Sequence, residues 1–164
     1  MMEGLKASFI LTRPEMLFLL NSAAGTTPSG PMEHLLSKCF SSATVSEETV
    51  GGLADKGLIT KTPDKVSLEP VIGLLARSAM TAGKLWIVNE GAEDKMMILR
   101  SDEMYLYIKR YPLIADSWRI APYRTASGLH DEFGGIAVRN VRIIGQQGEE
   151  AFIESPNDFA WLEV

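Results

Sequence analysis

The chain has 164 residues, 46% of them hydrophobic and 23% charged, with one cysteine and a formal net charge of −5. A chain of this length and composition can fold as one domain without a disulfide or a structural metal, and the single Cys39 is typical of a reducing compartment. The charge is −1 over residues 1–83 and −4 over residues 84–164, so neither half has the bulk positive charge of a nucleic-acid-binding protein.

Four helices are expected in the first half of the chain. Thr12 and Pro14 mark the start of the first helix, and Ser46 followed by Glu47 marks the start of the third. Apolar residues recur at helical spacing within each segment. The expected helices cover residues 14–24, 31–40, 46–56 and 70–83, and short strands at 58–60 and 66–68 enclose a turn.

The longest apolar run near the N-terminus, Met16 to Leu20, is five residues long. A membrane helix needs about 20 apolar residues, and the hydrophobic part of a secretory signal needs roughly 7–15. We therefore expect a cytoplasmic protein that does not bind a membrane.

Gly51 and Gly52 lie inside the third expected helix. Two glycines there cost about 1–2 kcal/mol relative to alanines. Such a pair indicates either close packing of another backbone or a frayed, broken helix, and both interpretations stay open.

Near residue 84 the hydrophobic pattern changes to short runs of β-branched and aromatic residues. Strands are expected at 84–89, 95–100, 103–110, 112–121, 136–144, 150–153 and 159–162. The first three are joined by short connections, which predicts an antiparallel meander. Residues 122–135 contain Pro122 and several glycines, and we expect a long loop there with about one helical turn.

These elements predict an α+β fold, with N-terminal helices and a winged-helix-like segment packed on a mostly antiparallel sheet. We expect one domain over residues 1–164, with a helical half (1–83) and a strand-rich half (84–164). No covering helix is expected after residue 84. Exposed sheet edges must be paired or protected, so a homodimer is the expected oligomeric state.

Aromatic and basic residues are interleaved between residues 105 and 124. The period of two in the strand 103–110 gives one buried face and one aromatic face, partly exposed to water, that carries Tyr105 and Tyr107. Together with Trp118 and Tyr123 they are our candidates for a protein-binding surface. Packing in the core and stacking on single-stranded nucleic acid are the alternatives for the same residues.

No catalytic or metal-binding motif is evident. His34 and Cys39 are five positions apart, which on a helix separates their side chains by about 140°. Ser127 lacks the Gly-x-Ser-x-Gly frame of a nucleophile elbow, and the loop around His130 offers too few ligands for an ordinary metal site. We therefore expect no cofactor and no metal; a non-catalytic protein is favoured, and the question of an enzyme stays open.

The segment from Val45 to Val88 is laid out like a winged helix, with a helix, a short strand pair and a second helix. In DNA-binding proteins of this kind, the helix and the wing bring cations to the phosphates. Here the wing offers only Lys61 and Lys65 as nucleic-acid candidates. A DNA-binding regulator is therefore the alternative function and an uncharacterised enzyme the third, and we expect nucleic-acid binding to be weak and lost at physiological salt.

Three stretches together resemble part of the EspG family of cytosolic chaperones of type VII secretion in mycobacteria. They are Glu48-Thr-Val-Gly-Gly-Leu-Ala-Asp-Lys-Gly-Leu-Ile, Val66-Ser-Leu-Glu-Pro-Val-Ile-Gly-Leu-Leu-Ala-Arg and Lys84-Leu-Trp-Ile-Val. The resemblance covers about residues 45–110 and implies a chaperone that binds another protein, with no functional residue carried over. We therefore expect a non-catalytic protein-binding module, such as an adaptor or a secretion-type chaperone.

Overall fold

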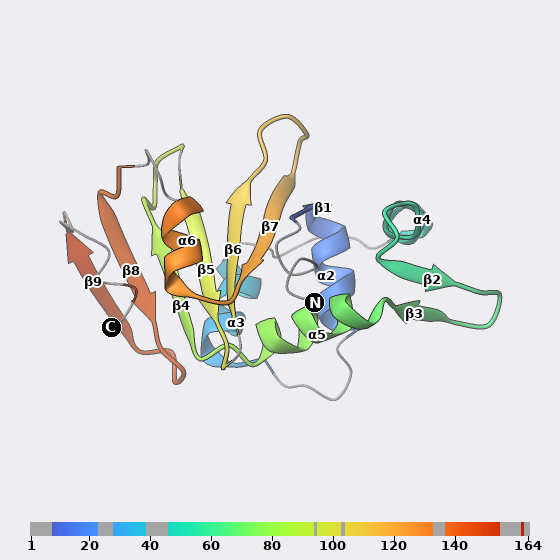
Figure 1. Ribbon diagram of the computed structural model, residues 1–164, viewed down its shortest axis with the longest axis horizontal. Helices are drawn as coiled ribbons and strands as arrows, with labels where there is room; N and C mark the ends of the chain where they lie inside the picture. The colour runs from blue at the N-terminus through green and yellow to red at the C-terminus, as the bar shows by residue number, and fades with distance from the viewer. Residues whose placement is uncertain are drawn as a thin grey trace.

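The fold is α+β, as expected, with helices on both faces of a central antiparallel sheet (Figure 1). The computed structural model describes residues 8–22, 28–38, 46–93, 95–102, 104–132, 137–154 and 162. In chain order the elements are β1 (Phe9–Thr12), α2 (Arg13–Asn21), α3 (Gly30–Lys38), α4 (Glu47–Asp55), β2 (Ile59–Lys61), β3 (Val66–Leu68), α5 (Pro70–Met80), β4 (Lys84–Val88), β5 (Met96–Arg100), β6 (Tyr105–Arg110), β7 (Ser117–Tyr123), α6 (Ala126–Glu132), β8 (Asn140–Ile144) and β9 (Glu150–Glu154).

The main sheet has the strand order β1-β7-β6-β5-β4-β8-β9 within the described residues, and its neighbouring strands are antiparallel. Strands β4, β5 and β6 form the expected meander, which β7 continues. The hairpin of β2 and β3 is a separate two-stranded sheet. It projects from the end of the molecule that carries α4, at the right of Figure 1.

The helix starts follow the capping residues of the sequence. The Thr12 hydroxyl accepts a hydrogen bond from the Glu15 backbone N–H, and Glu15 Oε1 accepts one from the Thr12 N–H at 2.9 Å. In α4, Thr49 takes the place of the glutamate in the same reciprocal arrangement with Ser46. Helix α2 ends at Asn21, earlier than expected. The last positions of the first two expected helices, 23–24 and 39–40, lie outside the described residues.

Three sequence expectations are corrected. Strand β1 was not expected; it is four residues long and pairs with β7. The strand expected at 112–121 begins at Ser117, because residues 111–116 form the turn of a hairpin. The expected loop 122–135 contains the end of β7 and helix α6. Of the strand expected at 159–162, only Leu162 lies within the described residues.

The sheet buries apolar side chains on both faces. On one face, residues such as Leu85 and Ile108 pack in a core with α2, α3, α4 and α5. On the other, Trp86 and Tyr107 form a second core with Leu129 of α6. The central strands are therefore covered twice, which explains the unbroken apolar runs of β4 and β5.

Helices α2 and α4 meet at a buried carboxylate. Glu15 is 4% exposed, and its Oε1 lies 2.5 Å from Lys56 Nζ at the end of α4. A Cβ on Gly52 would lie 2.6 Å from Glu15 Oε2, whereas a Cβ on Gly51 would have nothing within 4 Å. Gly52 is therefore closely packed, but against a side chain, so the expected approach of another backbone is wrong. Helix α4 is continuous through both glycines.

Candidate functional site

Tyr105 and Tyr107 lie in the second core. Tyr107 is 1% exposed and Tyr105 is 9% exposed, and the ring of Tyr105 lies 6.2 Å from that of Trp86, centroid to centroid. Helix α6 covers this face of the sheet, with Leu129 fully buried against it. The expectation of an aromatic face partly exposed to water is therefore wrong. In this arrangement the two tyrosines offer a partner almost no surface.

The other two candidate aromatic residues do not complete a patch. Tyr123 is half-buried on the same face and is paired with Tyr105 across β6 and β7. Trp118 is 9% exposed and lies on the opposite face, in the core beneath the larger helices. The structure thus brings three of the four candidates together and separates the fourth from them. Burial of Tyr105 and Tyr107 counts against their role as binding anchors, which stays a prediction for all four residues.

Cationic side chains lie over the rings of Tyr105, Tyr107 and Trp86. Arg100 lies 5.4 Å from the ring centre of Tyr105, and Arg119 lies 5.8 Å from that of Tyr107. Lys84 lies 5.6 Å from the ring centre of Trp86. These separations are typical of cation–π contacts. Arg119 belongs to the interleaved segment, and so does Arg110, which lies 6.0 Å from the ring centre of Trp118; these two contacts explain that part of the pattern without nucleic acid.

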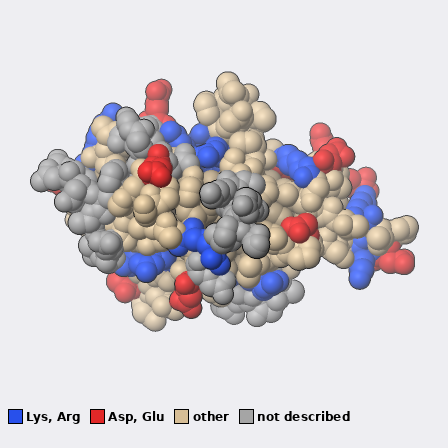
Figure 2. Space-filling view, viewed as in Figure 1, with Lys and Arg blue, Asp and Glu red and all other residues tan. Residues whose placement is uncertain are grey.

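The two candidate nucleic-acid residues lie on the projecting β2–β3 hairpin. Lys61 ends β2, and Lys65 lies in the turn, where its carbonyl accepts a hydrogen bond from the Thr62 hydroxyl at 3.1 Å. Both lysines are exposed, and so is Asp64 between them. In Figure 2 this end of the molecule shows cations and anions side by side. The winged-helix assignment stays a prediction.

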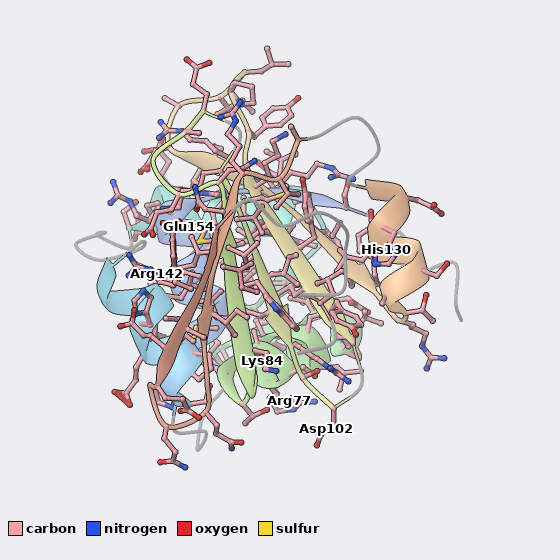
Figure 3. The ribbon with its side chains drawn as sticks, turned by 90° about the vertical axis from the view of Figure 1, so that its left-hand side faces the viewer. Arg77, Lys84, Asp102, His130, Arg142 and Glu154 are labelled. Atoms are coloured by element: carbon pink, nitrogen blue, oxygen red, sulfur yellow. The ribbon has the colours of Figure 1, made fainter. Side chains whose placement is uncertain are left out.

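Helix α6 carries His130, and Figure 3 places this histidine well apart from Asp102, Arg142 and Glu154. Within the described ranges, no three His, Cys, Asp or Glu side chains are grouped as metal ligands.

Among the helices that the structure describes, none is both long enough and apolar enough to span a bilayer. Cys39 lies outside the described residues.

The hairpin between β6 and β7 presents exposed apolar side chains. Residues 112–115, Pro-Leu-Ile-Ala, are all exposed and uncharged, and we call them the apolar tip. Leu113 is 80% exposed and Ile114 is 50% exposed. Figure 1 shows this hairpin projecting beyond the neighbouring strands, and in Figure 2 its end is an uncharged knob. Contiguous exposed apolar residues of this kind are typical of interaction sites.

The base of the hairpin is held by several polar contacts. The Tyr111 N–H donates to the Ser117 carbonyl at 2.8 Å. Asp116 has a positive φ of 55°. Its backbone carbonyl accepts a hydrogen bond from the Arg13 N–H at 3.1 Å. Its carboxylate forms an ion pair with the Arg13 guanidinium at 3.1 Å. The apolar tip is therefore tied to the first residue of α2. An ordered tip loses less conformational entropy on binding than a flexible loop would.

Three cationic residues lie in β6 and β7 next to the hairpin turn; two of them lie over rings, Arg110 over Trp118 at 6.0 Å and Arg119 over Tyr107 at 5.8 Å. Lys109 lies directly opposite Arg119, and Arg110 is the last residue of β6. We call these three residues the cationic collar. The single acidic residue of the turn, Asp116, is paired with Arg13. The end of the hairpin therefore combines an apolar projection with positive charge behind it, as Figure 2 also shows.

Sequence reasoning missed the apolar tip because it assigned residues 112–121 to one strand. Leu113 and Ile114 have high strand propensity, which concealed the turn. Pro112 and Asp116 are the available signal, since proline and aspartate are both typical of turns.

No family model matches the chain, and no curated protein matches it.

Proposed function

We propose that this protein is a non-catalytic protein-binding module, which inserts the apolar tip of the β6–β7 hairpin into a pocket of a partner protein. The observation that carries the proposal is the 80% exposure of Leu113 beside the half-exposed Ile114, on a hairpin fixed at its base. Binding energy at protein interfaces is concentrated in a few well-buried anchors. A rigid projecting pair of this kind suits that role.

The charge around the tip specifies the partner further. The cationic collar of Lys109, Arg110 and Arg119 would lie at the rim of the interface when the apolar tip is inserted. Complementary charge at such a rim increases the association rate and selects among partners. The expected partner surface is therefore an apolar pocket with acidic residues around its edge.

An adaptor or a secretion-type chaperone is the proposed cellular role, in keeping with the resemblance to the EspG family over residues 45–110. That resemblance supports the role only through its generic helix and strand pattern. The DNA-binding alternative gains little from the structure, because exposed Asp64 lies between the wing lysines Lys61 and Lys65.

Capture from a lysate of the native host tests the proposal. The wild-type chain and the Leu113→Asp variant are compared as baits, and bound proteins are quantified by mass spectrometry. Full burial of a leucine contributes about 1.5–3 kcal/mol, so the variant is expected to retain at least tenfold less of the true partner. The expected result is a host protein that the wild-type chain captures and the Leu113→Asp variant does not, and that the control variant described next captures as the wild type does.

The matched control is Leu74→Asp, which makes the same chemical change at an exposed position of α5. Equal capture by wild type and both variants would contradict the proposal.

Anionic vesicles serve as a second arm, because an apolar knob with cations behind it also fits a lipid surface. The wild-type chain could bind these vesicles and lose that binding in the Leu113→Asp variant, while the lysate capture shows no protein depleted. That result would identify a membrane, and not a protein, as the partner of the apolar tip.

A further inference from the structure

Strand β9 ends the main sheet on one side, and within the described residues no strand pairs with its outer edge. Figure 1 shows β9 at the left of the molecule, away from the tip of the β6–β7 hairpin. An edge strand presents unpaired backbone N–H and C=O groups, to which an extended segment of another chain can add as a further strand. The pairing of β9 with β8 decides which of its groups are available.

The hydrogen bonds around β8 identify the outward groups of β9. The Gly145 N–H donates to the Glu149 carbonyl at 2.8 Å, so the odd-numbered residues of β9 are the ones that bond to β8. On the other side of β8, the Asn89 N–H donates to the Asn140 carbonyl at 3.0 Å, which requires the same alternation. The N–H and C=O groups of the even-numbered residues of β9 therefore point away from the sheet.

The even-numbered residues of β9 are Glu150, Phe152 and Glu154, and we call them the acidic edge. Their side chains share one face of the strand, because alternate side chains of a strand point the same way. All three are exposed, and Phe152 is 55% exposed. The same residues thus offer a partner strand both their backbone groups and a row of acidic, aromatic and acidic side chains.

The charge of the acidic edge is negative. Arg142 of β8 lies opposite Phe152, and its guanidinium pairs with Glu90 at 2.9 Å and with Glu150 at 3.4 Å, so that one cation is shared by two carboxylates. None of the described residues forms an ion pair with Glu154. Figure 3 views the molecule from this edge and shows Arg142 and Glu154 on the same side of the sheet. Cations opposite these carboxylates would stabilise an added strand.

A second copy of β9 does not suit this edge. In an antiparallel pair of two β9 strands that overlaps all five residues, Glu150 of each copy lies opposite Glu154 of the other. Like charges directly opposite each other destabilise a sheet, and charges on edge strands oppose self-association. The same two carboxylates favour a partner strand that carries cations at both positions.

We propose that β9 binds an extended basic segment of another protein, which adds to the sheet as a further strand. The segment carries an apolar residue opposite Phe152 and a Lys or Arg two positions away on each side, opposite Glu150 and Glu154. Backbone hydrogen bonds provide affinity in such complexes, and the alternate side chains provide specificity. This surface is separate from the apolar tip, and its binding does not depend on the proposed function.

Amide hydrogen exchange on the full chain, followed by NMR, tests the proposal. The probe is the peptide Thr-Lys-Thr-Val-Thr-Lys-Thr with both ends capped, which we call the lysine peptide; the glutamate peptide has Glu in both Lys positions. We expect the lysine peptide to slow exchange of the acidic-edge amides in a saturable way. The amides of Ala151 and Ile153 should not change, because they already bond to β8. The glutamate peptide is expected to bind at least about fivefold more weakly.

Charge reversal on the protein tests the pairing of side chains. The double variant with Glu150→Lys and Glu154→Lys is expected to prefer the glutamate peptide over the lysine peptide by at least about fivefold. Glu48→Lys is the matched control on α4, at the other end of the molecule in Figure 1, and should keep the wild-type preference. A lysine peptide with Pro in place of Val lacks the N–H that would pair with Phe152, and is expected not to slow exchange.

The proposal is overturned if the lysine peptide does not slow exchange at the acidic edge, or if the two peptides bind equally well. Equal slowing at Phe9–Thr12 would also overturn it, because the peptide would then pair with the uncharged edge strand β1 as readily. Slowing that depends on protein concentration, without peptide, would identify a second copy as the occupant instead. If the double variant fails to fold, the two peptides on the wild-type chain decide the question alone.

Discussion

Glu15 shows how a single residue fixes the contact between two helices. Its carboxylate completes the capping box of α2, pairs with Lys56 and occupies the space beside Gly52. A carboxylate this deeply buried requires such partners, because an unpaired buried charge is costly. The glycine in α4 is therefore explained by the side chain of another helix.

The two neighbouring glycines are expected to respond oppositely to alanine. Gly51→Ala should raise the free energy of unfolding by about 0.5–1 kcal/mol, since alanine favours the helix and nothing lies within 4 Å of its Cβ. Gly52→Ala should lower it by about 1–2 kcal/mol, because displacing the Glu15 carboxylate breaks a hydrogen bond to Thr12 or to Lys56. Urea unfolding measures both. A stabilising Gly52→Ala would contradict this account of the contact.

Tyr107 is expected to contribute to stability and not to partner binding. The Tyr107→Ala variant should lose about 3–5 kcal/mol of unfolding free energy, as large aromatic truncations in cores do, because this side chain is 1% exposed. Thermal or urea unfolding gives the value. A loss below about 1 kcal/mol would mean that the aromatic face opens in solution, and would restore Tyr105 and Tyr107 as binding candidates.

Helix α6 is the element that converts the aromatic face into a core. We expect Leu129→Ala to lower the free energy of unfolding by about 2–5 kcal/mol, because Leu129 is fully buried against the sheet. Ser127→Ala, at an exposed position of the same helix, should change it by less than about 0.5 kcal/mol. Similar unfolding midpoints for the two variants would show that α6 does not cover this face in solution.

The sequence predicts the elements with strong local signals, including the three-residue strands β2 and β3, and misses β1 and α6. Capping residues and helical spacing located α2, α3, α4 and α5, and the change of period at residue 84 located the meander. Helix α6 is seven residues long and contains Gly128, so it presents too few turns for a periodic signal. Strand β1 is four residues long, and its conformation is set by pairing with β7.

The candidate site could not be predicted for a related reason. Alternation in β6 correctly put Tyr105 and Tyr107 on one face, but burial of that face depends on α6, which is a tertiary contact. Exposure of Leu113 likewise depends on where the hairpin turns. Local propensity cannot distinguish a buried apolar run from an exposed one.

At the scale of the whole molecule, stability and binding belong to different regions. Two cores on opposite faces of the sheet hold the fold, and the apolar tip projects beyond both. Leu113→Asp is therefore expected to change the free energy of unfolding by less than about 0.5 kcal/mol. Chemical denaturation of the purified variant checks this expectation. A larger loss would mean that the tip supports the fold.

The central claim is that the apolar tip contacts a partner protein, and site-specific photocrosslinking in the native host tests it most directly. A photoreactive phenylalanine replaces Leu113 in one experiment and Leu74, on α5, in the other. We predict a discrete protein adduct from position 113 that is absent from position 74. No adduct at position 113, or the same adducts at both positions, would contradict the claim.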